Sequence, residues 1–136
     1  MTTPYRTGDA PEPVLAAFNG KVFAFEPTSG RRRWTYDSET SAVVRLALDG
    51  GRVYVLVRAS LACLDLTSGV VIWSTRCIDG DTILVAGGLI LVGGAGEVAC
   101  LSRDGNRVWT DELKGHGIGD VTLAYKGIVA SADRSG

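Results

Sequence analysis

Three tryptophans recur at nearly equal intervals along this chain of 136 residues. They are Trp34, Trp73 and Trp109, so the intervals are 39 and 36 residues. Each lies four positions after a glycine that closes a short polar turn; these glycines are Gly30, Gly69 and Gly105. A period of this size is typical of a fold built from one repeated supersecondary unit. The repeat therefore indicates the architecture, and it says nothing by itself about chemistry.

The composition is that of one folded domain. Hydrophobic residues make up 46% of the chain, and 18 glycines accompany 4 prolines, which favours a packed core with many tight turns. A formal net charge of −1 gives no general field that would attract nucleic acid or an acidic membrane. No apolar run is long enough for a membrane span, and the first residues lack the apolar stretch of a secretory signal. We expect a cytoplasmic protein, or a periplasmic one if a signal was removed.

Each repeat unit has the pattern of short strands joined by turns. The second unit predicts strands at 42–49, 52–57, 61–65 and 70–75, and the third at 82–86, 89–92, 97–102 and 106–111. The first unit supplies only three strands, at 14–18, 21–26 and 31–36, and a partial fourth unit supplies 119–125 and 128–132. Several strands are apolar at consecutive positions, which predicts sheets that are covered on both faces.

Four-stranded antiparallel sheets, covered on both faces and repeated about every 40 residues, are typical of β-propeller blades. We therefore predict an all-β propeller with about three to three and a half blades per chain. The predicted repeats are 13–37, 42–78, 79–114 and a partial 115–136, after a flexible N-terminal segment at 1–12.

The residues around each tryptophan carry a further pattern: a small residue, an acid two positions later, a Thr/Ser-Gly turn and then the tryptophan. The small residues are Ala24, Cys63 and Cys100, and the acids are Glu26 and Asp65, with Ser102 as a departure in a turn one residue shorter. This pattern resembles the tryptophan-docking motif of quinoprotein (PQQ-like) β-propellers. In that family each tryptophan packs on the glycine turn of a neighbouring blade. The resemblance implies blade-docking roles for Gly30, Trp34, Gly69, Trp73, Gly105 and Trp109.

The cysteines Cys63, Cys77 and Cys100 show no CxxC spacing, and any disulfide scheme leaves one of them unpaired. Cys63 and Cys100 occupy the small position of the repeat, where a free cysteine packs as a small hydrophobe. We expect buried thiols rather than metal or redox groups.

Four other patterns have a functional and a structural interpretation, and the structural one is favoured in each. Gly94 to Ala99 fits a dinucleotide fingerprint, but no helix is expected after it, so a hairpin turn is predicted. His116, without paired cysteines or a placed acid and nucleophile, is expected to be a loop residue. Asp79-Gly80-Asp81 lacks the later ligands of a calcium loop and is expected to be an inter-blade turn. Arg31-Arg32-Arg33 alternates in direction along a strand, so a solvated turn edge is favoured over a phosphate or acidic-partner site.

The resemblance implies two classes of function. Enzymes of the family oxidise an alcohol or sugar with PQQ and calcium on the axis of an eight-bladed ring, and some carry a disulfide between adjacent cysteines that this chain lacks. Other members have lost the cofactor and act as interaction platforms, such as envelope-assembly factors and sensor domains. We expect a non-catalytic binding or scaffolding propeller with no catalytic residues, no cofactor and no metal. A PQQ-dependent dehydrogenase-like fragment, or a sensor domain of a larger protein, is the alternative.

Ring closure yields a further expectation about partners. Propellers typically have about four to eight blades, so three and a fraction leave an apolar face open at each end. We expect a homo-oligomer, with a dimer favoured, in which 119–125 of one copy completes the first unit of the next. The segment 128–132 repeats a strand type that the first unit already has. A protein partner is also possible, but nucleic acid and a membrane span are not expected.

Overall fold

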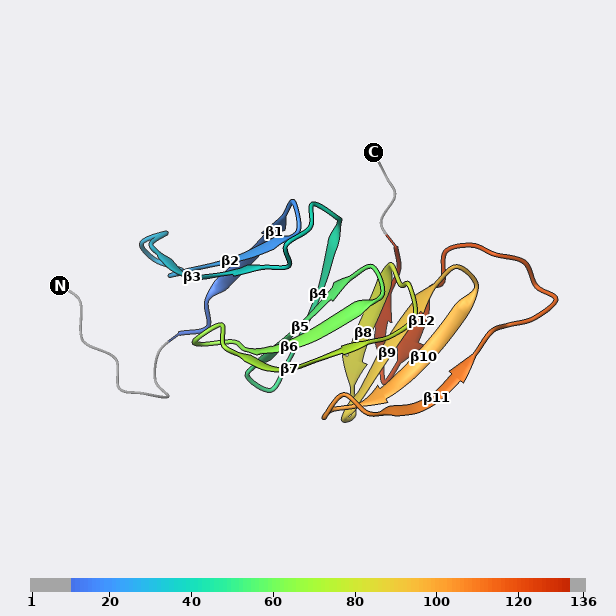
Figure 1. Cartoon of the computed structure of the whole chain (residues 1–136). Helices are drawn as coiled ribbons and strands as arrows, with labels where there is room; N and C mark the ends of the chain where they lie inside the picture. The colour runs from blue at the N-terminus through green and yellow to red at the C-terminus, as the bar shows by residue number, and fades with distance from the viewer. Residues whose placement is uncertain (1–10, 133–136) are drawn as a thin grey trace.

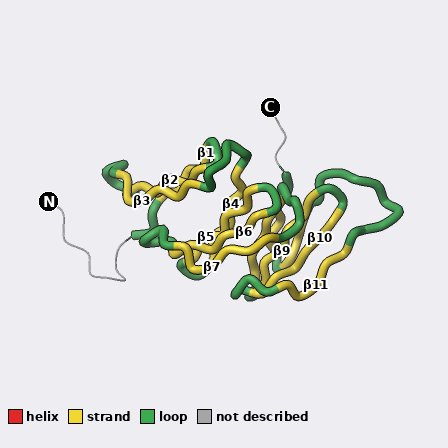
Figure 2. The backbone as a smooth tube through the Cα atoms, in the orientation of Figure 1, coloured by secondary structure: helices red, strands yellow, loops and turns green. Residues whose placement is uncertain are grey.

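The computed structural model describes residues 11–132, which form strands joined by turns and loops (Figure 2). None of the described residues lies in a helix, so the described part of the chain contains no helix that could cross a membrane. The predicted flexible segment at 1–12 lies outside the described residues except for its last two positions, and 133–136 also lie outside.

The described strands form four antiparallel sheets that follow one another in chain order (Figure 1). The first sheet consists of β1 (Val14–Phe18), β2 (Lys21–Phe25) and β3 (Arg32–Asp37). The second consists of β4 (Val44–Asp49), β5 (Arg52–Val57), β6 (Ser60–Asp65) and β7 (Val71–Arg76). The third consists of β8 (Thr82–Ala86), β9 (Leu89–Gly94), β10 (Glu97–Ser102) and β11 (Arg107–Asp111). The fourth consists of β12 (Leu123–Tyr125) and β13 (Ile128–Ala130). The predicted fold class, an all-β propeller of about three and a half blades, is confirmed.

The strands of each blade pair in sequence order, which leaves every sheet with two free edges. The inner strands β4 and β8 lie next to each other, and β12 continues the series beside β8. Glycines at positive φ, such as Gly51 (79°) and Gly88 (78°), allow the two-residue turns between the first two strands of a blade.

The blades stack face to face, which explains why β5 is apolar at consecutive positions. Successive side chains of a strand point to opposite faces. Val53 and Val55 therefore pack in the core between the first and second sheets, whereas Tyr54 and Leu56 pack in the core between the second and third. The predicted burial of both faces is thus observed for the central blades.

The last two strands of each of the first three blades shift in register at the same place, next to the tryptophan. Trp34, Trp73 and Trp109 lie across the strand pair from the small residues Ala24, Cys63 and Cys100, respectively. In each blade the register shifts by one residue directly after that small position. Such a bulge re-aims the side chains that follow it, and the small residue leaves room for the indole on the same face.

The predicted strand at 119–125 is wrong in its first half, because β12 begins only at Leu123. The backbone before it bonds to the third blade instead of to a strand partner. Gly119 accepts a hydrogen bond from the Gly96 amide at 2.9 Å, and the Val121 carbonyl accepts one from the Thr82 hydroxyl at 2.7 Å. The last predicted strand is also shorter than expected, since β13 ends at Ala130.

Among residues 11–132, the first sheet has three strands and no inner strand, as the sequence predicts. Its strand β1 occupies the position that β5 and β9 occupy in the complete blades. β5 and β9 are almost wholly buried, but Val14 and Phe18 of β1 are 53% and 71% exposed. The free edge of β1 is therefore an apolar strand without the neighbour that its counterparts have.

Candidate blade-docking interface

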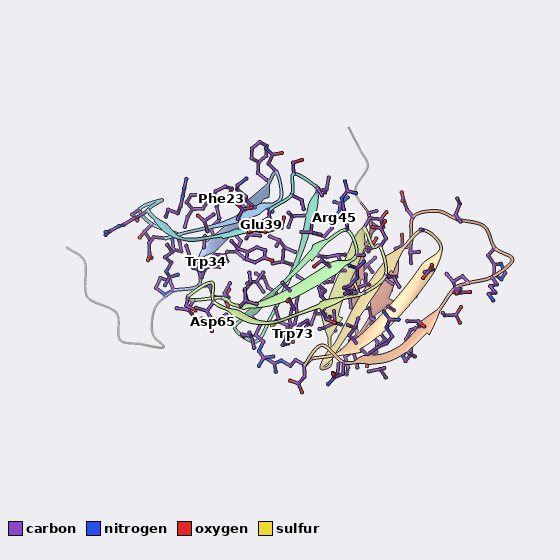
Figure 3. The ribbon with its side chains drawn as sticks, in the orientation of Figure 1. Phe23, Trp34, Glu39, Arg45, Asp65 and Trp73 are labelled. Carbon is purple, nitrogen blue, oxygen red and sulfur yellow. The ribbon has the colours of Figure 1, made fainter. Side chains whose placement is uncertain are left out.

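Trp34 joins the first blade to the second. It projects from β3 toward the turn between β6 and β7, where its Nε1 donates a hydrogen bond to the Leu66 carbonyl at 3.0 Å. Gly69, at a φ of 76°, lies directly under the indole, and a Cβ added there would overlap the ring. Figure 3 shows Trp34 beside the turn that follows Asp65. The contact requires a glycine for two reasons, the left-handed backbone and the close approach of the ring.

Trp73 makes the same contact one blade further along. Its Nε1 donates to the Arg103 carbonyl at 3.1 Å, and a Cβ at Gly105 would lie 2.8 Å from Cε3 of the indole. The ring also packs against Tyr54, with 6.2 Å between the two ring centroids. Trp73 therefore borders the core between the second and third sheets (Figure 3).

The acidic residues of the motif bind groups within their own blades. In the second blade, Asp65 accepts bonds from the amide and the hydroxyl of Ser68, both at 2.8 Å. These bonds hold the pKa of the Asp65 carboxyl below its usual value. In the first blade, the Glu26 carboxylate instead pairs with Arg33 at 3.1 Å. Asp65 thus stabilises the turn that follows it, and Glu26 forms an ion pair across its own turn.

The two ends of the series remain unmatched within the described residues. Trp109 is 47% exposed, and its Nε1 has no hydrogen-bond acceptor among residues 11–132. At the other end, a Cβ at Gly30 would meet no atom within 4 Å. The structure therefore brings Trp34 to Gly69 and Trp73 to Gly105, while the Trp109 indole and the Gly30 turn each lack the other half of the contact.

The sequence did not indicate two further contacts between blades. Arg103 lies in the shortened third turn and donates from Nη2 to the Gly50 carbonyl at 3.3 Å, while Arg52 donates to the Arg103 carbonyl at 3.4 Å. The buried hydroxyl of Thr82 bonds to the loop before β12. A lone arginine in a turn and a threonine at a strand start carry no pattern that would have revealed these partners.

The cysteines are free thiols in the described structure, and Cys63 and Cys100 are buried as expected. Cys77 is half-buried, and burial raises its pKa to about 11. A thiol with that pKa stays protonated at neutral pH and is a poor nucleophile.

The four patterns that had an alternative chemical interpretation lie in turns, in loops and at a strand edge. Ala95 and Gly96 form the turn between β9 and β10, and no helix follows within the described residues. His116 lies exposed in the loop after β11, and Asp79 to Asp81 connect β7 to β8. In the arginine run, Arg32 lies over the Phe23 ring at 5.1 Å, whereas Arg33 binds Glu26. Arg33 also donates from Nη1 to the Pro11 carbonyl at 3.0 Å, so the run makes several separate local contacts.

A cleft of about 410 Å³ opens between the first and second blades. Its charged residues are Arg58, Arg76 and Asp79. Within the part of the chain that the structure describes, no group of three or more His, Cys, Asp or Glu residues could hold a metal ion. The cleft thus has a lining of both apolar and polar residues. The two unmatched blade-docking ends are more distinctive surfaces.

The fold and the docking contacts define a β-propeller of PQQ-like repeats. A family model described as outer membrane protein assembly factor BamB matches residues 18–136. Because the match covers most of the chain, the protein belongs to this family of PQQ-like repeat β-propellers. No curated protein matches the sequence.

Solved structures show the same fold. BamB from Moraxella catarrhalis is 22% identical with a TM-score of 0.64, and the match covers 84% of this chain and 37% of BamB. The quinohemoprotein alcohol dehydrogenase from Comamonas testosteroni is 23% identical with a TM-score of 0.60, over 74% of this chain and 20% of the enzyme. The computationally designed protein Ika8 is 13% identical with a TM-score of 0.69, over 91% of this chain and 43% of that protein. The chain therefore spans less than half the length of each of these proteins.

Proposed function

We propose that this protein is a non-catalytic binding and scaffolding propeller that completes its ring by associating with a second copy of itself. The observation that carries the proposal is the pair of unmatched ends, an exposed Trp109 and an open Gly30 turn. Within the described part of the chain, the first and last blades also have fewer strands than the two complete blades. An apolar strand edge of this kind tends to pair with another chain.

The scaffolding role is supported by the name of the matching family, an outer membrane protein assembly factor. The structural neighbours include enzymes as well, so the fold alone does not separate the two classes. The chain's own residues favour the scaffold. Its acidic motif residues Glu26 and Asp65 bind groups within their own blades, and its buried cysteines pack as small apolar side chains.

We expect sedimentation equilibrium at micromolar concentration to give twice the mass of one chain. The physical reason is that a closed ring would bury the apolar edges that a single copy exposes. The control is the same measurement over a dilution series, which should dissociate a reversible dimer by mass action. A stable monomer at micromolar concentration would contradict self-association. The open ends would then be covered by a further part of a longer chain or by a different protein.

The enzyme alternative has its own test. We expect protein incubated with PQQ and calcium to show no bound quinone absorption band and no calcium-dependent reduction of a redox dye. A quinoprotein dehydrogenase assayed in parallel is the positive control. A bound quinone band together with dye reduction would overturn the non-catalytic proposal and favour the dehydrogenase class.

The cellular location also stays a proposal. The name of the matching family, an outer membrane protein assembly factor, supports the periplasm over the cytoplasm. Fractionation of cells that express the native gene would separate the two.

A further inference from the structure

The blade-docking contact occurs twice in this chain, so a third instance can be specified atom by atom. The turn that ends at Gly30 has the same length and the same backbone hydrogen bonds as the turn that ends at Gly69. The Gly30 amide donates to the Glu26 carbonyl at 2.9 Å, and the Gly69 amide donates to the Asp65 carbonyl at 2.8 Å. The φ angles of the two glycines are 72° and 76°. The Gly30 turn is therefore a copy of a turn that already receives an indole.

The acceptor in the open turn follows from this equivalence. In the Gly69 turn, the indole of Trp34 bonds to the carbonyl of Leu66, three residues before the glycine. The corresponding residue before Gly30 is Pro27. A proline has no amide hydrogen but keeps its carbonyl acceptor, so the Pro27 carbonyl can play the part of the Leu66 carbonyl.

We propose that Trp109 of one copy docks on the Gly30 turn of a second copy and donates its Nε1 hydrogen to the Pro27 carbonyl there. This inference rests on the proposed self-association and deepens it by naming the interface. The contact is heterologous, because the donor and the receiving turn lie at opposite ends of the chain. Such contacts form a ring only if the rotation closes. Two copies close it when each supplies both halves of the contact.

The position of Trp109 dictates a shared blade. Trp34 and Trp73 each reach into the sheet that follows their own, so Trp109 of the third sheet must reach into the fourth. The first sheet of the second copy must then take the place of the fourth sheet. In the described residues that sheet, β1 to β3, has no inner strand, and β12 already lies in the inner position beside β8. The shared blade is β12 of one copy with β1, β2 and β3 of the other.

This arrangement sets the number of blades. Each copy contributes its complete second and third sheets, and each of the two junctions makes one shared blade. A dimer therefore forms a ring of six blades, within the range of about four to eight that propellers use.

The strand β13 must leave β12 when the shared blade forms, because β13 and β1 are both second strands. β13 pairs with β12 over three residues, whereas β1 pairs with β2 over five. Ile128 and Val129 of β13 are 47% and 68% exposed, so the burial lost when β13 moves is mainly that of Ala130, which packs against the cluster around Leu84 and Leu123. If β13 stayed, the incoming sheet would sit one strand further out, about 4.8 Å away. The Gly30 turn would then be too far from Trp109 for a hydrogen bond.

Three variants of the full chain test the contact. Trp109→Ala removes the indole, and Gly30→Ala places a methyl group where the incoming ring must lie. Gly51→Ala is the matched control, because Gly51 has a φ of 79° and a Cβ there also meets nothing within 4 Å. It introduces the same backbone strain away from the interface. Circular dichroism of each variant checks that it remains folded.

We expect Trp109→Ala and Gly30→Ala each to raise the dimer dissociation constant at least about 100-fold, because buried interface tryptophans are typical hot spots and the ring contains the contact twice. Gly51→Ala should leave the constant within about threefold of the parent. The sharper measurement mixes the two weakened variants in equal amounts. One junction of the mixed dimer then joins an intact Trp109 to an intact Gly30 turn. The mixture should associate at least about tenfold more tightly than either variant alone.

The outcomes separate the inference from the proposed function. A parent chain that is monomeric overturns both. A parent dimer that is unaffected by Trp109→Ala and Gly30→Ala leaves self-association standing and overturns this interface. If both variants raise the dissociation constant and the mixture does not lower it again, the head-to-tail contact is wrong. The dimer would then form through two identical faces. Weakening with rescue supports the shared blade.

Discussion

Replacing Trp73 by alanine is expected to lower the free energy of unfolding by about 3 kcal/mol, the lower end of the range for a buried tryptophan. The side chain is half-buried, which places the loss at that end. The substitution removes the indole from Gly105, its hydrogen bond to the Arg103 carbonyl and its contact with Tyr54. It thereby opens the boundary between the two complete blades.

Urea denaturation at one fixed protein concentration measures this loss, since association would otherwise shift the midpoint. Ile72→Ala is the matched control, because Ile72 neighbours Trp73 on β7 and its side chain is 45% exposed. We expect that control to cost less than about 1 kcal/mol. Trp34→Ala should fall between the two, because no aromatic contact of Trp34 matches that of Trp73 with Tyr54 in the described structure. Equal stability of Trp73→Ala and the parent would refute the docking assignment.

The second large effect is expected from Gly69→Ala, a change of one methyl group. A Cβ at this position would overlap the Trp34 indole, and a φ of 76° disfavours any residue with a side chain. Backbone strain contributes about 1–2 kcal/mol, and displacement of the packed ring adds a further 1–3 kcal/mol. We expect a total loss of about 3 kcal/mol in the free energy of unfolding, measured by urea denaturation.

Gly51→Ala separates these two contributions. Gly51 has a φ of 79° and open space around its missing Cβ, so alanine there introduces the strain without the collision. The difference between the two variants therefore reports the contact between Trp34 and the glycine turn. If Gly51→Ala destabilised the protein as much as Gly69→Ala, backbone strain alone would explain the loss of unfolding free energy in Gly69→Ala. The indole would then have no part in holding the blades together.

Sequence patterns predicted the fold because the same strand and turn patterns occur in each repeat unit. Consecutive apolar residues along 89–92 indicated a strand that is covered on both faces, and β9 is such a strand. The turn glycines and the small residues before them indicated hairpins of one design, and the repeated register shift after Ala24, Cys63 and Cys100 has the same origin. Local sequence determines these features, since they need only neighbouring strands of one blade.

The regions that sequence patterns missed depend on distant partners. The predicted strand included residues 119–122, yet Gly119 and Val121 bond to Gly96 and Thr82 of the third blade. Arg103 bridges to Gly50 across more than fifty residues of chain. Nothing near these residues specifies such partners, because each contact exists only after two blades have stacked.

Sequence patterns predicted the repeated blade and the order of its strands, and the resemblance to quinoprotein propellers named six candidate residues for blade docking. The sequence by itself could not distinguish the three copies of the motif, because their local sequences are nearly equivalent. The tertiary structure alone decided that Trp34 and Trp73 are engaged while Trp109 and the Gly30 turn are not. The physical reason is that docking requires a neighbouring blade on the correct side. Within the described chain, Gly30 has none before it, and the last blade offers Trp109 no glycine turn.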